Sequence, residues 1–329
     1  MIHSIDPAAC TGCGTCTKTC PLEVFRLEPA QEALSPCMAA CLAGVDIRGN
    51  HYLIQQGHLG EAARRYRIVQ PFPAITGRVC FHPCEEKCAR NHVDEAVNIN
   101  AVEQIMGDWD LKAPLEKPAR MHITEVAVIC SGPAGLSGAW VLAQMGYPVT
   151  VFEAMPLPGG MLRYGIPAYR LPDAIVAAHI ARLEAMGIAF RCNTKIGEGA
   201  DLSLSDLKRL GFKAVMLAPG TTVSRKVRME GVELPGVHWG LEFLRANRGD
   251  EQPRLSGDVL VIGGGDVAVD AAITAQRLGA AKVSMACPES RETMPAYPHT
   301  PADALRTGPE HHCGLGPGTL LHDHGTRPG

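Results

Sequence analysis

The stretch EVAVICSGPAGLSGAWVLAQMGYPVTVFEA, residues 125–154, decides the fold. A short apolar, β-branched run leads into a glycine-rich turn, and helix-like sequence and a second apolar run follow. This order predicts a β–α–β unit. Free N–H groups at the start of such a helix attract the phosphates of a dinucleotide. We therefore predict an α/β dinucleotide-binding fold around this stretch.

Single residues of this unit have expected roles. Gly132 would let the backbone approach a pyrophosphate, and Gly135 would allow close packing of helix on strand. Pro133 and Ala134 complete the turn, and Glu153, at the end of the second run, is placed for a ribose hydroxyl. These residues together form a candidate cofactor-binding loop.

The first position of the turn departs from the usual pattern. Cys130 stands where a glycine normally makes the tight turn, so its β-carbon should strain the loop or push on the phosphates. The alternatives are that Cys130 is a tolerated small residue or that it has a redox role.

A second unit of the same kind occurs at residues 259–287, VLVIGGGDVAVDAAITAQRLGAAKVSMAC. Its turn fits G-x-G-x-x-A through Gly263, Gly265 and Ala268, with Asp266 directly after the turn. KAVMLAPG, residues 213–220, reads as another buried strand. Two such units predict two nucleotide-binding domains in one chain.

Composition excludes several classes of protein. The chain has 329 residues, 31 of them basic and 34 acidic, and aromatic residues make up 5%. This near balance of charges does not indicate the excess of basic residues that binding to nucleic acid or an anionic membrane requires. No apolar run approaches the roughly 18 residues of a membrane span, and the start MIHSIDP lacks the features of a signal peptide. A cytoplasmic location is expected.

Cysteine is concentrated near the start: nine of the 13 lie at or before Cys88. CTGCGTCTKTCP, residues 10–21, has the spacing C-x2-C-x2-C-x3-C-P of bacterial ferredoxins. It predicts a 4Fe–4S site with Cys10, Cys13, Cys16 and Cys20 as ligands, although the fourth cysteine of this motif normally serves a different cluster. A zinc knuckle is the alternative, but zinc sites usually come as two separated ligand pairs.

A further cysteine group lies in SPCMAACLAGVDIRG (35–49) and TGRVCFHPCEEKCARNHVDEAVNINAVEQ (76–104). These stretches resemble the N-terminal iron–sulfur domain of the glutamate synthase small subunit. The same domain occurs in dihydropyrimidine dehydrogenase and in NADH-dependent ferredoxin:NADP oxidoreductase. The resemblance covers about residues 35–298. It implies a mainly α-helical iron–sulfur domain followed by α/β Rossmann-like FAD- and NAD(P)-binding domains.

The resemblance also implies cluster ligands. One 4Fe–4S cluster would be held by Cys41, Cys80, Cys84 and Cys88. Cys37 would bind a second cluster, with Glu103 at the position where the family uses Glu or Gln. The family has a C-x2-C pair shortly before Cys37, but here that stretch is RLEPAQEALSP. We therefore expect the opening motif to build the second cluster. A solvated helix carboxylate is the alternative for Glu103.

The segment PLPGGMLRYGIPAYRLP, residues 156–172, resembles the family's flavin-contacting segment. The resemblance implies FAD contacts at Gly159, Gly160 and Met161, with Arg170 in the same segment. In the second unit, many family members carry two arginines that bind the 2′-phosphate of NADP. Pro288 and Glu289 stand there instead, which favours NAD over NADP, while Arg291 keeps NADP open.

The resemblance implies an electron-transfer oxidoreductase, FAD- and iron–sulfur-dependent, that passes electrons between NAD(P)H and a partner protein or domain. We expect five parts: a ferredoxin-type motif (1–30), a helical iron–sulfur domain with its linker (31–120), a partial FAD domain (121–235), a partial NAD(P) domain (236–299) and an irregular tail (300–329). The second nucleotide domain has only two recognisable strands. The alternative is therefore a truncated iron–sulfur electron carrier without NAD(P)H oxidation of its own. A zinc-stabilised interaction module and metal binding by the His-rich tail are weaker alternatives.

Overall fold

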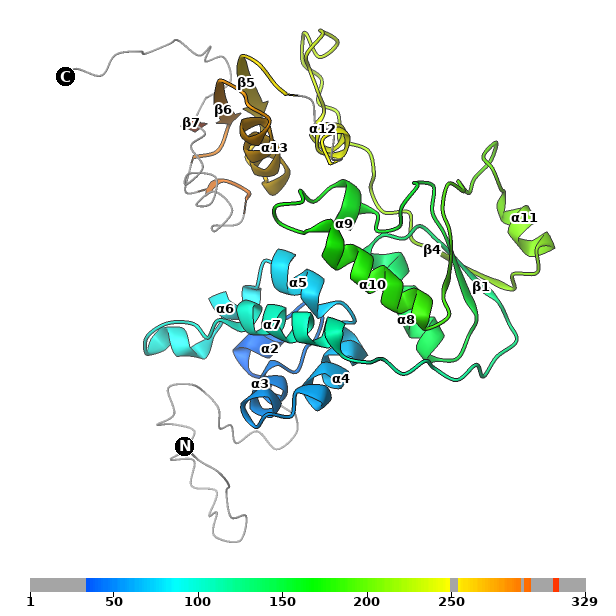
Figure 1. Cartoon of the computed structure of the whole chain (residues 1–329). Helices are drawn as coiled ribbons and strands as arrows, with labels where there is room; N and C mark the ends of the chain where they lie inside the picture. The colour runs from blue at the N-terminus through cyan, green and yellow to red at the C-terminus, as the bar shows by residue number, and fades with distance from the viewer. Residues whose placement is uncertain (1–33, 249–253, 291–292, 297–309, 314–329) are drawn as a thin grey trace, which may run out of the picture. The chain divides into compact units, whose positions relative to one another are not determined.

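A computed structural model of the chain describes residues 34–248, 254–290, 293–296 and 310–313, and Figure 1 shows their helices and strands. The contacts divide the chain into two compact units. The first runs to Lys117 and includes Ala177–Arg182, and the second comprises Pro118–Val176 and the chain from Leu183 onward. Within the described residues, no helix combines the length and apolar character that crossing a membrane requires.

The described part of the first unit is helical, as the sequence predicts, and its residues before Lys117 are coloured blue to cyan in Figure 1. Its helices are α2 (Pro36–Ala40), α3 (Ile47–Gln55), α4 (Leu59–Val69), α5 (Pro73–Val79), α6 (Pro83–Glu86), the 3-10 helix Ala89–His92, and α7 (Ile99–Lys112). Side chains at the N-cap position determine where two of these helices begin. Asp46 caps α3 by accepting a hydrogen bond from the Gly49 N–H at 2.9 Å, and Asn98 caps α7 in the same way.

Apolar residues recur at helical spacing through residues 51–70. The structure divides this stretch into two helices, since α3 ends at Gln55 and α4 begins at Leu59. Gly57, between them, has φ of +79°, which glycine adopts without steric cost. The chain therefore turns here and continues as a second helix.

Two glycines allow α5 and α7 to pack closely. A β-carbon on Gly107 would lie 2.1 Å from the backbone nitrogen of Ala74, and one on Gly77 would lie 2.5 Å from the backbone of Gln104. Any larger residue at either position would push the helices apart. This contact matters because Cys80 ends α5 and α7 carries Glu103.

A buried charged group lies in the same unit. Asp110 of α7 is 1% exposed and pairs with Arg67 of α4 and, at 2.9 Å, with Arg182 of α10 (Asp173–Ala185). A buried carboxylate needs such partners, because an unpaired charge away from water is costly. The two arginines therefore fix the C-terminal half of α7.

The second unit contains a parallel four-stranded sheet in the order β3-β2-β1-β4. Its strands are β1 (Val126–Ile129), β2 (Val149–Phe152), β3 (Ala189–Arg191) and β4 (Ala214–Leu217). Helix α8 (Pro133–Gln144) connects β1 to β2, as the sequence predicts. Val126 is in register with Val149 on one side and with Ala214 on the other. Helices α9 (Met161–Tyr164) and α11 (Leu204–Arg209) also belong to this part, whereas Phe243 of α12 (Gly240–Ala246) packs into the core that contains Val269 and Val283.

β4 differs from the prediction of a buried strand. It lies at the edge of the sheet, and its Leu217 side chain is 63% exposed. A groove of about 570 Å³ between β1, β4 and α8 is lined almost wholly by apolar atoms. The strand is apolar enough to be buried, but no described strand pairs with its outer edge.

A second sheet follows the order β5-β6-β7, again parallel. β5 (Asp258–Ile262), α13 (Asp266–Arg277) and β6 (Lys282–Cys287) form the predicted second β–α–β unit. β7 (Glu310–Cys313) was not foreseen, because the sequence predicted only two strands here and an irregular tail. A short strand of polar residues has no apolar alternation that could identify it.

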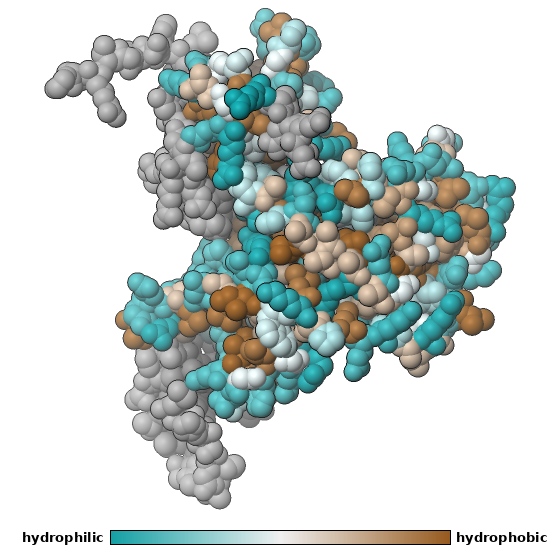
Figure 2. All heavy atoms as spheres, in the orientation of Figure 1, coloured by the Kyte–Doolittle hydropathy of each residue, from teal (hydrophilic) through white to brown (hydrophobic). Residues whose placement is uncertain are grey.

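The surface is mixed in character. Figure 2 shows hydrophobic, brown side chains interrupting the hydrophilic surface on the visible face. The exposed large hydrophobic residues of the first unit include Ile68 and Ile105. Scattered exposure of this kind is normal for a folded protein.

Candidate cofactor sites

The first glycine-rich turn joins β1 to α8. Gly132 is the N-cap residue of α8, Pro133 takes the first helical position, and no side chain of the described residues caps this helix. A β-carbon on Gly132 would meet no atom within 4 Å, and Ala134 is exposed beside it. Free N–H groups and open space therefore coincide here, as a bound phosphate requires.

Gly135 has the predicted packing role. A β-carbon at this position would lie 2.0 Å from the carbonyl oxygen of Cys130. No side chain can be accommodated at that distance. The glycine therefore lets the first turn of α8 approach the end of β1.

Cys130 adopts φ of +76°, so it occupies the left-handed region that favours glycine. Its N–H donates to the Phe152 carbonyl at 2.8 Å, which holds the turn in place. This confirms the expectation that the side chain sits where the turn needs a glycine. Burial, and next the Glu153 carboxylate, raise the pKa of the Cys130 thiol. A raised pKa disfavours the reactive thiolate and argues against a redox role.

Ser131 connects three parts of the same loop, and sequence reasoning missed it. Its hydroxyl donates to Glu153 Oε2 and accepts from the Gly159 N–H at 2.9 Å. The Ser131 N–H also donates to Glu153 Oε2 at 2.9 Å, and the Met155 N–H donates to Oε1 at 2.9 Å. Glu153 is 4% exposed, and its hydrogen bonds hold the first glycine-rich turn in place. Its contact with a ribose stays a prediction.

The second predicted flavin segment lies against the first turn. Gly159 and Gly160 have φ of +138° and +53°, and a β-carbon on Gly160 would lie 2.5 Å from Cα of Gly132. Met161 directly follows as the first residue of α9. The structure therefore brings Gly132, Gly159 and Gly160 together, as one cofactor site requires.

Arg170 forms an ion pair with a residue of the second β–α–β unit. Its Nη1 lies 2.9 Å from Oδ2 of Asp270, a buried carboxylate on α13, and the Tyr169 hydroxyl donates to the same carboxylate at 3.2 Å. The guanidinium of Arg277 stacks 4.1 Å from the Tyr169 ring centroid. These contacts attach the predicted flavin segment to the second nucleotide helix. A contact of Arg170 with the cofactor stays a prediction.

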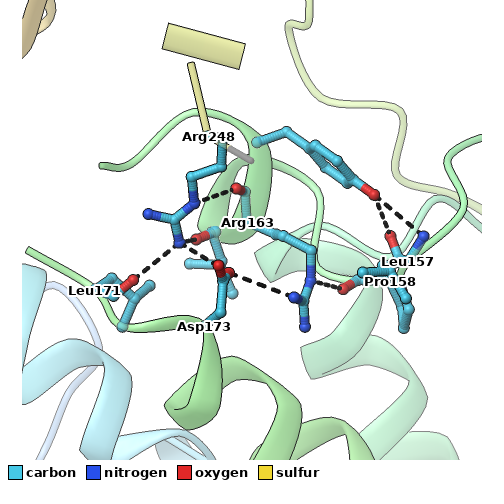
Figure 3. Close-up of polar contacts among 8 residues, drawn as sticks. Leu157, Pro158, Arg163, Leu171, Asp173 and Arg248 are labelled. Carbon is cyan, nitrogen blue, oxygen red and sulfur yellow. Dashed lines mark hydrogen bonds and ion pairs between the residues drawn. The ribbon is translucent and has the colours of Figure 1, made fainter. Parts of the chain in front are cut away.

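Arg248 holds the same segment from another direction, and the sequence did not single it out. Figure 3 shows its guanidinium directed at the carbonyls of Arg163 and Leu171 and at Asp173. The donor–acceptor distances are 2.6, 2.9 and 3.1 Å. The Arg248 side chain is 6% exposed. Arg163 in turn donates to the carbonyl of Pro158 at 2.9 Å. One buried arginine therefore fixes the chain between Pro158 and Asp173.

The second glycine-rich turn, between β5 and α13, repeats this geometry. Gly263 has φ of +142° and donates its N–H to Ala286 at 2.8 Å, and a β-carbon there would lie 3.3 Å from that of Ala268. Gly265 is the N-cap residue of α13, and Asp266 is its first residue. A β-carbon on Gly265 would meet nothing within 4 Å. This turn also leaves room for a phosphate.

The residues after β6 bear on the choice of nucleotide. Cys287 is buried at the end of β6, and its thiol lies 3.5 Å from the carbonyl oxygen of Glu289. Glu289 is half-buried and lies just beyond the C-terminal end of β6. Because β5 and β6 are parallel, this end lies at the same edge of the sheet as the glycine-rich turn that follows β5. Arg291 lies outside the described residues.

Five of the predicted cluster cysteines are described, and none is in a disulfide. Cys84 and Cys88 are buried, whereas Cys37, Cys41 and Cys80 are half-buried. Burial raises the pKa of Cys84 to about 12, and the negative charges of Cys80, Glu85 and Cys41 add to the effect. Cys41, Cys80 and Cys84 therefore lie within electrostatic reach of one another.

Among the described side chains, no three Cys, His, Asp or Glu converge closely enough to hold a single metal ion. The thiols nevertheless fit a cluster in their chemistry, because thiolates are the ligands of 4Fe–4S centres. Cys10, Cys13, Cys16 and Cys20 lie outside the described residues. Ligation by any of these cysteines stays a prediction.

Glu103 lies near the cysteine group and is largely buried, so it is not a solvated carboxylate. Its Oε1 accepts from Gln70 Nε2 at 2.7 Å and from the Thr76 hydroxyl. Burial raises its pKa, and the two hydrogen bonds partly offset the rise. Glu103 also contributes to raising the pKa of Cys80. It is therefore close to the cysteines, with one oxygen already held by neighbours.

Three family models match the chain. Pyridine nucleotide-disulphide oxidoreductase matches residues 124–307, dihydropyrimidine dehydrogenase domain II with a 4Fe-4S cluster matches residues 31–114, and a 4Fe-4S binding domain matches residues 3–26. The first match extends across both expected nucleotide-binding parts and into the expected tail, so the boundaries between these parts stay predictions. The last one covers the opening cysteine motif.

Curated relatives are similar over most of the chain. The NADP(+)-dependent formate dehydrogenase subunit beta of Moorella thermoacetica is 35% identical over 322 residues, which cover 90% of this chain and 45% of that protein. The NADPH-Fe(3+) oxidoreductase subunit beta of Geobacter sulfurreducens is 37% identical, over 80% of this chain and 40% of that protein. The NAD-dependent dihydropyrimidine dehydrogenase subunit PreT of Salmonella typhimurium is 33% identical, over 80% and 64%.

The chain spans about half the length of these relatives. Among solved structures, FprA of Mycobacterium tuberculosis in complex with NADPH has a TM-score of 0.48 at 17% identity, over 57% of this chain and 48% of that one.

Proposed function

Because this chain belongs to the pyridine nucleotide-disulphide oxidoreductase family, we propose that it passes electrons between a nicotinamide dinucleotide and a partner protein through FAD and 4Fe–4S clusters. The observation that carries this proposal is the meeting of Gly132, Gly159 and Gly160 beside an uncapped helix start. That arrangement suits the pyrophosphate of a flavin dinucleotide.

When bound, FAD exchanges a hydride with nicotinamide and single electrons with iron–sulfur clusters. The chain's own residues position the cofactors. Ser131 and Glu153 hold the first glycine-rich turn, Arg248 holds the segment Pro158–Asp173, and the start of α13 receives the second nucleotide. No side chain needs to donate or accept a proton in this scheme.

The first unit would hold one 4Fe–4S cluster on Cys41, Cys80, Cys84 and Cys88. The electrostatic proximity of three of these thiols and the burial of Cys84 and Cys88 support this set. A second cluster would be built from the opening motif, with Cys37 and Glu103 as further donors. The family match of residues 3–26 to a 4Fe-4S binding domain supports it.

We propose NADH as the preferred nucleotide. Relatives are named for both NAD and NADP, so their names do not decide. A carboxylate at Glu289 can accept a hydrogen bond from a ribose 2′-hydroxyl and repels a 2′-phosphate. We also propose a partner subunit as the electron acceptor or donor, because the relatives include proteins named as subunits.

The exposed edge of the flavin sheet favours a second candidate function. Strands of parallel sheets are normally covered, yet Val215 and Leu217 of β4 are 39% and 63% exposed. A sheet that leaves an apolar strand exposed at its edge would support weak FAD binding. In that case the chain carries electrons through its clusters without oxidising NADH on its own.

One experiment separates these functions. Anaerobically prepared protein is analysed for iron, zinc and flavin, and NADH oxidation is then followed with an artificial acceptor. About eight iron atoms and one FAD per chain, with turnover of about 10 per second, support the first function. Iron without turnover supports the second. Stoichiometric zinc without iron contradicts both.

A further inference from the structure

Tyr66 of α4 carries a buried hydroxyl. The residue is 0% exposed, and its oxygen makes no hydrogen bond to the described residues. A buried tyrosine hydroxyl normally finds a partner, because leaving it unpaired costs the hydration it had in the unfolded chain. Each exception therefore requires an explanation.

The surroundings of this hydroxyl are the cysteine group. Tyr66 and Cys84 belong to one buried core, against which Cys37 and Cys41 are packed. The pKa of Tyr66 is raised, first by burial and then by the negative charges of Glu103, Cys41 and Cys84. Cys41 and Cys84, two thiols of the proposed cluster set, therefore lie within electrostatic reach of the Tyr66 hydroxyl.

A second residue in the same unit repeats the pattern. Asn50 of α3 is 1% exposed, and neither its amide nitrogen nor its amide oxygen has a partner among the described residues. Ile47 and Leu53, three residues to either side on the same helix, belong to the core that contains Tyr66. This core thus combines thiols with polar groups that lack partners in the described part of the chain, which a purely apolar core would not retain.

We propose that the Tyr66 hydroxyl donates a hydrogen bond to a sulfur of the 4Fe–4S cluster held by Cys41, Cys80, Cys84 and Cys88, and thereby raises the reduction potential of that cluster. The inference rests on the proposed function. The cluster gains one negative charge when it takes up an electron, so a donor aimed at its sulfur stabilises the reduced form more than the oxidised form. A phenol is suited to this role because it supplies a donor without adding a charge.

The test replaces the donor and keeps the ring. Tyr66→Phe is compared with Tyr52→Phe, a control on neighbouring α3 whose side chain is 62% exposed. Reduction is followed by electron paramagnetic resonance during anaerobic redox titration. We expect equal iron content in all three proteins. In Tyr66→Phe alone, we expect a fall of roughly tenfold in the equilibrium constant of one cluster's reduction, about 59 mV for one electron.

A second variant covers the case in which Tyr66→Phe loses its cluster. Site-specific 3-fluorotyrosine at position 66 makes the phenol a stronger donor, so the potential should rise. Resonance Raman bands of the cluster should also shift between H2O and D2O in the unmutated protein, and less so in Tyr66→Phe.

Unchanged potentials in both variants, with full iron content, would show that a buried water satisfies Tyr66 and would overturn the proposal. Failure of the proposed function looks different: the unmutated protein would contain no iron, and Cys84→Ser would change nothing.

Discussion

The Ser131 hydroxyl donates to Glu153 and accepts from the N–H of Gly159, so one buried side chain joins the first glycine turn, the end of β2 and the flavin segment. We predict that Ser131→Ala weakens FAD binding by about tenfold, because a hydrogen bond to a charged group is worth roughly 1.5 kcal/mol or more. Fluorescence titration with FAD measures the Kd. Ser137→Ala on α8 is the control, and equal affinities in both variants would contradict the role of Ser131.

Cys130→Gly should bind FAD more tightly and unfold at a higher temperature than the unmutated chain. The left-handed backbone at φ of +76° costs a side-chain-bearing residue about 1 kcal/mol or more, and glycine avoids this cost. Cys130→Ala is the matched control, since it removes the thiol but retains the β-carbon. If alanine and glycine have the same effect, the thiol rather than the backbone is responsible.

Arg248→Gln should loosen the segment Pro158–Asp173. The substitution removes charge-assisted hydrogen bonds from a buried position, and we expect a loss of about 2 kcal/mol of local stability. Hydrogen–deuterium exchange of peptides from this segment measures the effect. Arg225→Gln, at an exposed position, serves as the control. Arg248→Lys should rescue only in part, because lysine lacks the planar fork of donors.

His179 should make the first unit sensitive to acid. Burial, together with Arg182 and Arg78, lowers its pKa to about 3, and it packs edge-on against Phe72 at a centroid distance of 5.3 Å. The unfolded chain takes up the proton near pH 6.5 and the folded chain does not, so stability is intact above pH 6.5 and falls as the pH drops from there toward 3.

Between pH 7.5 and pH 5 this effect amounts to about 2 kcal/mol. We therefore predict that His179→Gln flattens the fall in thermal midpoint over this interval. His58→Gln, which replaces an exposed histidine of the same unit, is the control. A wild-type profile that is already flat would contradict the neutral, buried state of His179.

Replacing Pro288 and Glu289 with arginines should shift nucleotide preference toward NADPH by at least tenfold in the ratio of Kd values. Two guanidinium groups attract a 2′-phosphate that the Glu289 carboxylate repels. Isothermal titration with NADH and NADPH measures both constants. Glu233→Arg also replaces an acidic residue with a basic one at an exposed site. It controls for the effect of the protein's net charge on nucleotide binding. A preference for NADPH in the unmutated chain would assign recognition to another residue.

The two β–α–β units could be predicted because their signals are local. Strand, turn and helix follow one another within a few residues, and the demands on Gly132, Gly135, Gly263 and Gly265 are set by the turn itself. The unusual backbone of Cys130 was foreseen for the same reason. The G-x-G-x-x-G pattern leaves its second position free, however, so it contains no information on the bridging role of Ser131.

Features that depend on distant segments escaped sequence reasoning. Arg248 contacts carbonyls of Arg163 and Leu171, and a backbone acceptor leaves no trace in the sequence. Leu217 looks like a core residue, but its exposure depends on whether another strand pairs with β4. Tyr66 was hidden within a helical pattern, since a buried aromatic ring on an amphipathic helix is ordinarily part of the core.

Helix α10 has a consequence for how the chain can fold during synthesis. Residues Ala177–Arg182 belong to the first unit, although they are made some 60 residues after Lys117, at which the rest of that unit ends. Until they leave the ribosome, Asp110 lacks Arg182, one of its two arginine partners among the described residues. The first unit is therefore completed only after part of the second unit has been translated. A gene fragment that stops at residue 117 would encode the first unit without Ala177–Arg182.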